Sequence, residues 1–254
     1  MISDAHAHLD LDRFKDDRDR VIARAREAGL KWIINVCMIG EGADKALSLV
    51  EKHGFMRAIA GCHPHDAKGL GEEDLGRLER MAAHPKVVGI GEIGLDFFRN
   101  YSPHAAQREA FGAQLDLARW LGMPVVIHDR EAHQESLAML RESRIGTGMF
   151  HCFSGDVGMA GEVLDMGFYI SLPGSVTFKK AETAHAVASY VPLDRLLVET
   201  DCPFIAPVPY RGKRNEPAYV VETAKAVARI KGLDYEEVAA RTTSNLERLF
   251  GLRS

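Results

Sequence analysis

The chain opens with MISDAHAHLD, residues 1–10, in which a short strand-like run over residues 2–5 leads directly into His6 and His8. In an extended strand, side chains two residues apart point to the same side, so these two histidines face together. Ala5 and Ala7 are then expected to face the packed side. Two imidazoles placed in this way can chelate one metal ion. The stretch therefore predicts half of a metal site at the end of a strand, with the other ligands further along the chain.

Eight strand-like runs of this kind alternate with amphipathic helical patterns along the whole chain. Near-continuous apolar runs, rather than strict alternation, are typical of parallel strands that are covered on both faces. Strand and helix repeated eight times predict an α/β fold, first a (β/α)8 TIM barrel and second an open doubly wound sheet. The length of 254 residues is close to the usual size of such a barrel. The predicted strands are residues 2–5, 32–36, 56–60, 87–90, 124–127, 148–150, 168–171 and 196–198.

Two of the helical patterns carry clear boundary signals. The pattern over residues 19–28 ends at Gly29, a usual residue at the end of a helix. Ser102 and Pro103 precede the pattern that runs to residue 121, as at a first helical turn. Residues 234–250 follow the eighth unit and predict an additional C-terminal helix. No Gly/Ser-rich linker or low-complexity segment divides the chain, so we predict one domain over residues 1–254.

The composition limits the function classes. Hydrophobic residues make up 46% of the chain, and the net charge of −4 gives no overall attraction to polyanions, so a nucleic-acid substrate needs a local basic feature. The N-terminus has no signal-peptide pattern, and no apolar stretch reaches the roughly 18 residues of a membrane span. The four cysteines form no CxxC pair. We expect a reduced cytoplasmic protein with no membrane association and no obligate protein partner.

Six of the eleven histidines share one position, directly after a strand-like run. Glu92 and Asp201 share it too, after the fourth and the eighth run. In a parallel barrel the carboxyl ends of all strands meet at one face, where the active sites of such barrels are built. A single histidine there is usually a hydrogen-bonded core residue, but six of them with two carboxylates predict a shared site. The six histidines are His6, His8, His63, His65, His128 and His151.

The donor atoms of this predicted site are those of a transition-metal site. Imidazole and carboxylate together suit divalent zinc, manganese, nickel or iron, with magnesium less favoured where nitrogen is abundant. Four histidines and two acids are more than one tetrahedral ion requires. The excess predicts two divalent metal ions that share a bridging acid.

Nine short segments around these residues carry a family signal. They are HAHLD (6–10), GCHPH (61–65), GEIGLD (91–96), QREAF (107–111), IH (127–128), HCFSG (151–155), PGSVTFK (173–179), ETDCP (199–203) and RGKRNEP (211–217). In order and spacing they resemble the TatD-type deoxyribonucleases, a branch of the metal-dependent hydrolases built on a TIM barrel. The resemblance spans the chain from end to end.

The resemblance implies how the ligands are divided between the two ions. One ion would be held by residues of the first and last strands, namely His6, His8 and Asp201. The second would be held by His128 and His151, and Glu92 would bridge the two ions. The bridging position distinguishes this branch from related amidohydrolases in which a carbamylated lysine takes that place.

The resemblance also implies a reaction, the hydrolysis of phosphodiester bonds by a 3'-5' exonuclease acting on a DNA end or a short single strand. Glu92 and Asp201 would be the catalytic residues, with Asp201 as the general base beside the attacking water. Substrate would be bound by His63, His65, Arg211 and Asn215. Arg211 belongs to the basic run 211–214, the clearest local positive feature of the sequence.

Two other function classes stay open on the sequence. The same two-metal site would also serve a small-molecule amidohydrolase, esterase or lactonase, or an aminoacyl-tRNA deacylase, because activated water attacks carbonyl carbon as readily as phosphorus. The third class is a non-catalytic binding protein that has kept the barrel, and the intact ligand set argues against it. The basic run and the family motifs favour a phosphate ester.

Overall fold

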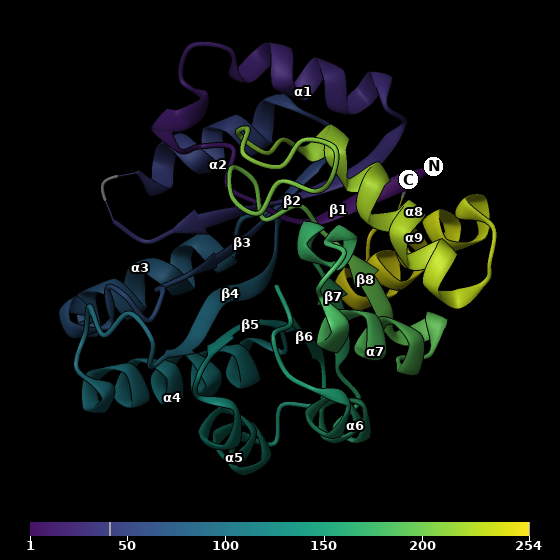
Figure 1. Cartoon of the computed structure of the whole chain (residues 1–254). Helices are drawn as coiled ribbons and strands as arrows, with labels where there is room; N and C mark the ends of the chain where they lie inside the picture. The colour runs from purple at the N-terminus through teal and green to yellow at the C-terminus, as the bar shows by residue number, and fades with distance from the viewer. Residues whose placement is uncertain (41, 254) are drawn as a thin grey trace.

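Eight parallel strands, hydrogen-bonded in the order β1 to β8, form the centre of the molecule (Figure 1). The protein is represented by a computed structural model that describes residues 1–40 and 42–253. The predicted (β/α)8 TIM barrel is confirmed, and each predicted strand is present. The strands are β1 (Ile2–Ala7), β2 (Leu30–Met38), β3 (Met56–Gly61), β4 (Val87–Asp96), β5 (Val125–Arg130), β6 (Gly148–Phe150), β7 (Tyr169–Leu172) and β8 (Leu196–Val198).

The sheet closes between β1 and the residues that follow β8. The backbone N–H of Asp201 donates to the carbonyl of His6, and the N–H of His8 donates to the carbonyl of Cys202, both at 2.9 Å. Ala7 and Cys202 form a parallel bridge at the same level. An open doubly wound sheet has no such pairing between its first and last strands. The first of the two predicted architectures is therefore the correct one.

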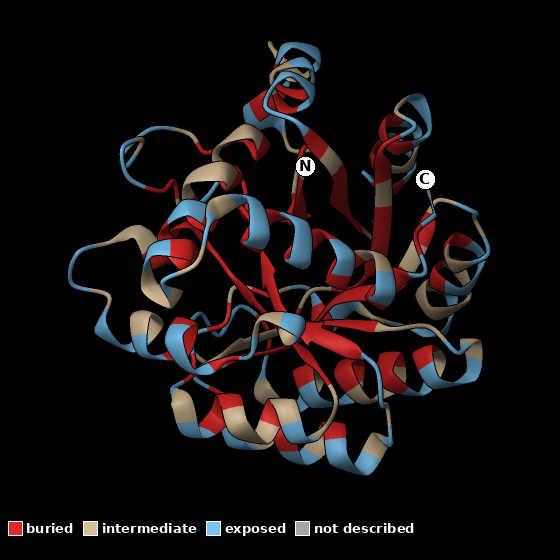
Figure 2. Ribbon diagram, turned by 90° about the vertical axis from the view of Figure 1, so that its right-hand side faces the viewer, coloured by how far each residue is buried: buried red, intermediate tan, exposed pale blue. Residues whose placement is uncertain are grey.

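The helices form an outer ring around the strands (Figure 2), with buried residues facing inward and exposed residues facing solvent. None of them, within the described ranges 1–40 and 42–253, combines the length and the apolar content that a membrane crossing needs. The helices are α1 (Arg18–Glu27), α2 (Ala43–Lys52), α3 (Glu72–Ala82), α4 (His104–Leu121), α5 (His133–Ser143), α6 (Val157–Asp165), α7 (Glu182–Tyr190), α8 (Val220–Lys231) and α9 (Tyr235–Phe250).

The boundary signals of the sequence hold with one exception. Gly29, just past α1, has a φ of +82°, which glycine adopts at little cost. Pro103, not Ser102, occupies the N-cap of α4. The hydroxyl of Ser102 instead donates to the carbonyl of His65 at 2.8 Å and accepts from the N–H of Lys68 at 3.1 Å. Ser102 therefore ties together the segments after β3 and β4 rather than capping the helix.

The predicted C-terminal helix, α9, closes the end of the barrel where the strands begin. Its Leu246, Leu249 and Phe250 belong to the same buried cluster as the residues that fill the barrel interior, among them Ile34, Val36, Ile59, Val126 and Leu197. The side-chain amide of Asn245 donates to the carbonyls of Leu193 and Leu196, both at 2.8 Å. With that end closed by apolar packing, the opposite end is the one that is free to carry polar groups.

The two alanines beside His6 and His8 do not share one face, contrary to the expectation from simple alternation. Ala5 lies in the inner cluster, whereas Ala7 lies in the outer layer between strands and helices. The pairing of β1 with β2 shifts register between Asp4 and Ala7, so the strict period of two is interrupted there. The histidines nevertheless converge, with their Nε2 atoms 3.2 Å apart.

The contact between β4 and β5 depends on a glycine. Gly94 has a φ of +142°, and a Cβ atom there would lie 2.0 Å from the carbonyl oxygen of His128. We therefore expect Gly94→Ala to destabilise the protein by about 2–5 kcal/mol, since both backbone strain and overpacking oppose it. Urea unfolding followed by circular dichroism measures this change.

Gly112→Ala is the matched control, because Gly112 lies inside α4 with its nearest neighbour, Cε of Met139, 3.8 Å from an added Cβ. This substitution should leave stability unchanged or raise it by about 0.5–1 kcal/mol, as expected for glycine to alanine within a helix. Equal unfolding midpoints for both variants would contradict the close approach of β4 and β5.

Candidate metal centre

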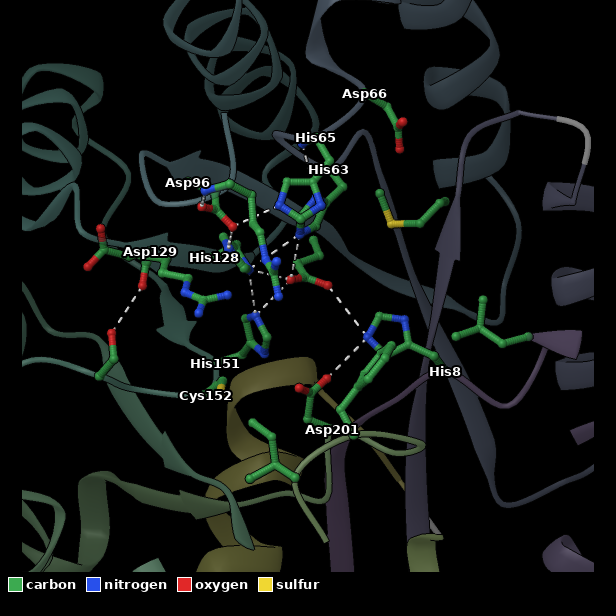
Figure 3. A pocket seen from close by; sticks show the side chains of 18 residues that line it. His8, His63, His65, Asp66, Asp96, His128, Asp129, His151, Cys152 and Asp201 are labelled. Carbon is green, nitrogen blue, oxygen red and sulfur yellow. Dashed lines mark hydrogen bonds and ion pairs between the residues drawn. The ribbon is translucent and has the colours of Figure 1, made fainter. Parts of the chain in front are cut away.

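A pocket of about 710 Å³ opens at the carboxyl ends of the strands. Seven of the eight residues predicted from their strand-end positions line it, and Figure 3 shows their side chains pointing toward one another. The eighth, His6, is fully buried next to them, with its ring stacked on that of His151 at a centroid distance of 3.9 Å. The fold thus gathers the predicted residues from β1, β4, β5 and from the segments after β3, β6 and β8.

Glu92, inside β4, lies at the centre of this group. Its Oε1 is 2.7 Å from Nδ1 of His128 and 2.8 Å from Nε2 of His151. Its Oε2 is turned the other way, 3.2 Å from Nε2 of His6 and 3.7 Å from Nε2 of His8. The two oxygens of one carboxylate therefore face two separate sets of imidazole nitrogens. This is the arrangement that a carboxylate shared by two cations requires.

Asp201 completes the set on the β1 side. Its Oδ1 is 3.2 Å from Nε2 of His8 and 3.9 Å from Nε2 of His6. His6, His8 and Asp201 form one of three groups, among the described residues, that could hold an ion. The donor atoms within each group lie within 4.8 Å of one another. The other two groups both include Glu92, one with His6 and His151 and the other with His63 and His128.

The donors fit divalent metal ions on chemical grounds. Nε2 of His6 and Nε2 of His8 lie 3.2 Å apart, and both face oxygens of Glu92 and Asp201. Neutral imidazoles and ionised carboxylates are the ligand forms that divalent cations bind.

The electrostatics of the cluster favour these forms for the acids and for His63. Burial alone would raise the pKa of Glu92, but the charges of His151 and His63 and hydrogen bonds from His128 and His151 hold it well below its usual range. Burial likewise opposes ionisation of Asp201, and the hydrogen bond and charge of His8 outweigh it, so its pKa is lowered. For His63, burial dominates and lowers the pKa to about 4. Near neutral pH both acids are therefore ionised and His63 is neutral.

The pKa values of His8, His128 and His151 are raised, whereas burial lowers the pKa of His6. Burial lowers the pKa of His128, but hydrogen bonds from Asp96 and Glu92 overcome that effect. For His151, burial is outweighed by Glu92 and Glu199. A cation at these nitrogens takes the place of protons, so metal binding here is expected to release protons and to weaken as the pH falls.

Two buried carboxylates behind the histidines were not predicted from the sequence. Oδ2 of Asp96 is 2.8 Å from Nε2 of His65 and 3.3 Å from Nε2 of His128. Oε1 of Glu199 lies 3.4 Å from Nδ1 of His151. Carboxylates in this position orient metal-binding histidines and fix their tautomers. For Glu199 the signal was available, because it directly follows the eighth predicted strand, whereas Asp96 ends β4 only because that strand runs beyond the predicted residues 87–90.

The substrate-binding predictions divide into two pairs. His63 and His65 line the pocket, as predicted, whereas Arg211 and Asn215 are not among its lining residues. Asn215 is fully buried, and its amide donates to the carbonyls of Thr200 and Phe204 at 2.8 and 2.7 Å. Its Oδ1 accepts from the N–H of Glu216 at 3.0 Å. With these groups occupied, Asn215 holds the loop together and has no free amide for a substrate.

The arginines that line the pocket are not those of the basic run 211–214. In the basic run 211–214, Arg214 makes two 2.7 Å hydrogen bonds to Asp17, and Arg211 is not among the residues that line the pocket. Instead, Arg99 and Arg130 line the pocket. They follow or end strands β4 and β5, beside the predicted ligands, so the local basic feature is built into the site itself.

Comparison with known proteins gives consistent matches over the whole chain. A family model described as "TatD related DNase" matches residues 3–251. The chain is 42% identical over 253 residues to the "Uncharacterized metal-dependent hydrolase YabD" of Bacillus subtilis (strain 168), covering 98% of this chain and 99% of that protein. It is 37% identical over 257 residues to the "3'-5' ssDNA/RNA exonuclease TatD" of Erwinia tasmaniensis, covering 98% and 99%. The crystal structure of YJJV, a TatD homolog from Escherichia coli K12, superposes with a TM-score of 0.93 at 28% identity, covering 99% of this chain and 98% of that one.

The carboxylate behind His128 leads to a test by metal binding alone. We expect Asp96→Asn to raise the dissociation constant for Mn²⁺ or Zn²⁺ by about 10- to 100-fold, because the imidazole loses its charged hydrogen-bond partner. Calorimetric titration of metal-depleted protein measures the affinity, and circular dichroism checks the fold.

Asp66→Asn makes the same change of charge at the same pocket and serves as the control. Asp66 lines the pocket but is exposed and is not within 4.8 Å of the donor groups described above. Its replacement should change the affinity by no more than about threefold, the scale of a screened surface charge. Equal effects of the two substitutions would show that Asp96 acts only through overall charge.

Proposed function

Because this chain belongs to the family of TatD-related DNases and is a metal-dependent hydrolase, we propose that it removes nucleotides from an end of single-stranded DNA. The match over residues 3–251 confirms the resemblance carried by the sequence motifs. A relative that is 37% identical is named a 3'-5' exonuclease for single-stranded DNA and RNA. That direction of cleavage is part of the proposal for this chain.

In this proposal two divalent ions would be held by residues in or directly after five strands. His6, His8 and Asp201 would hold one ion, His128 and His151 would hold the other, and Glu92 would be shared between them. The observation that carries the proposal is the orientation of Glu92, whose Oε1 and Oε2 face different sets of histidines at 2.7–3.2 Å. Nε2 of His63 also lies 3.2 Å from Oε1 of Glu92, while its Nδ1 accepts from the N–H of His65 at 3.1 Å, so the neutral ring turns its one N–H toward the ligand cluster.

The chemistry that such ions supply is polarisation of the phosphate oxygens and ionisation of water near neutral pH. The chain supplies the proton acceptor. Asp201 is ionised because His8 lowers its pKa, and its side chain remains 12% exposed at the pocket wall. We therefore assign it as the general base that takes a proton from the attacking water.

The pocket itself supports a phosphate ester over a carboxylic ester. Arg99 and Arg130 line it next to the donor groups, and guanidinium ions bind phosphate oxygens well. A volume of about 710 Å³ suits the end of a strand rather than a long segment. The net charge of −4 also disfavours extended contact with a duplex backbone.

The proposal predicts metal-dependent shortening of a labelled single strand. Protein loaded with Mn²⁺ or Zn²⁺ should shorten a 5'-labelled oligonucleotide stepwise, and excess chelator should abolish the activity. Asp201→Asn should lower kcat by about 10²- to 10⁴-fold, because it removes the proton acceptor. Gel electrophoresis of time points gives both the rate and the direction.

Asp116→Asn, an exposed position on α4 paired with Arg119, serves as the control and should keep the rate of the unmodified protein. Equal rates for Asp201→Asn and the unmodified protein would refute the assignment of the general base. Turnover of p-nitrophenyl carboxylic esters or aminoacyl-tRNA, without cleavage of any nucleic acid, would replace the proposal with the amidohydrolase, esterase or deacylase alternative.

A further inference from the structure

Exposed aromatic side chains gather at the mouth of the pocket. Among the described residues, five aromatic side chains are largely exposed, those of Phe98, Tyr101, Trp120, Tyr190 and Phe204. Three of these five stand at the pocket. Phe204 lines it and lies 6.0 Å from the ring of His8, measured between centroids. The ring of Tyr101 lies 4.8 Å from that of His65, and Phe98 immediately precedes the lining residue Arg99.

Core packing does not account for these three rings. Phe98 is 47% exposed, Tyr101 58% and Phe204 44%, so roughly half of each side chain is in contact with solvent. Single exposed apolar side chains are common, but a group of them beside a concave site marks a binding surface. Their position at the edge of the proposed active site indicates that they contact what enters it.

Arginine side chains accompany the rings. The guanidinium carbon of Arg130 lies 4.0 Å from the centroid of Phe98, and that of Arg99 lies 5.5 Å from it. On the other side, the guanidinium of Arg13 lies 5.8 Å from the centroid of Phe204. Stacking faces combined with positive charge are the composition of surfaces that bind single-stranded nucleic acid, where bases stack on rings and cations meet phosphates.

The two groups lie on opposite sides of the metal centre. Phe98 and Tyr101 follow β4, whereas Phe204 follows β8. In a closed barrel with the strand order β1 to β8, these two strands are diametrically opposed (Figure 1). The ring of Phe204 lies beside that of His8, and the ring of Tyr101 lies beside that of His65, so the two groups contact different histidines of the cluster. A strand whose phosphate reaches the metal centre therefore has an aromatic ring available on each side.

We infer that these rings are two stacking sites for unpaired bases, one on each side of the phosphate that is cleaved. Phe204, which lines the pocket, receives the terminal base, and Phe98 with Tyr101 receives the part of the strand that leaves the pocket. The inference rests on the proposed phosphodiesterase function and names the residues that hold the bases of its single-stranded substrate. Within a duplex the face of each base is covered by its stacked neighbours and is not available to protein rings.

The stacking sites can be tested by measuring the binding of a single strand under conditions in which it is not cleaved. In an Asp201→Asn background with Mn²⁺, anisotropy of a fluorescein-labelled single strand measures the dissociation constant without turnover. Phe98→Leu and Phe204→Leu should each raise it by about 5- to 150-fold, the cost of losing one base stack. Phe98→Tyr and Phe204→Tyr, which keep the rings, should stay within about threefold of the background value.

Trp120→Leu is the matched control, an exposed aromatic residue on α4 that does not line the pocket and is 69% exposed. It should leave the dissociation constant unchanged. In proteins with intact Asp201, Trp120→Leu should also leave the hydrolysis of bis(p-nitrophenyl) phosphate unchanged, because Trp120 lies outside the pocket. A blunt duplex of the same sequence should bind at least about tenfold more weakly than the single strand.

The outcomes separate this inference from the proposed reaction. If the leucine variants bind the single strand as tightly as the Trp120→Leu control, or if the duplex binds equally well, the stacking sites are wrong and the exonuclease proposal stands on its own assay. If the single strand is bound through the rings but no phosphodiester is cleaved by the metal-loaded protein, the proposed reaction is wrong and the binding sites remain.

Discussion

The hydrogen bonds that close the barrel also assemble half of the metal centre. Asp201 N–H to His6 carbonyl and His8 N–H to Cys202 carbonyl join two segments from opposite ends of the chain, at 2.9 Å each. The side chains of the same residues are the donor group on the β1 side of Glu92. Because backbone closure fixes the side chains, the site cannot loosen without opening the barrel. A cation bound to these groups should accordingly stabilise the closed fold, since the unfolded chain does not present them together.

The opposite end of the barrel explains why so many ionisable groups can be tolerated at this one. Helix α9 closes that end with apolar side chains and with the amide of Asn245, so apolar side chains fill the barrel interior where the strands begin. The carboxylates of the candidate site gather at the other end, where Glu92, 3% exposed, is surrounded by imidazoles. Buried charges are costly unless they are paired, and here the pairing partners are the other ligands. Asp96 and Glu199 add further pairs of this kind, because each carboxylate lies beside a histidine that also faces Glu92.

The sequence predicted the features that depend on local pattern and missed those that depend on distant partners. Strands and helices were predictable from residues within each segment. Strands buried on both faces appear as continuous apolar runs, and helices appear as amphipathic patterns. The ligands were predictable because a parallel barrel converts the position "end of a strand" into a common location. Glu199 also directly follows a predicted strand. Its role, like that of Asp96, nevertheless depends on which histidine it faces. Likewise, a basic run such as 211–214 gives no sign that Arg214 is already paired with Asp17.

The role of Asn215 follows from the same distinction between local pattern and distant contact. Its amide joins the carbonyl of Thr200, which precedes the proposed general base, to the carbonyl of Phe204, which carries the proposed inner stacking ring. The neighbouring Glu216 is held by Arg24 of α1 through hydrogen bonds of 2.8 and 2.6 Å. Removing the amide would leave two carbonyls unsatisfied, one of them buried with Thr200, which is costly. Asn215 therefore holds together the segment that runs from Thr200 to Phe204, which includes Asp201.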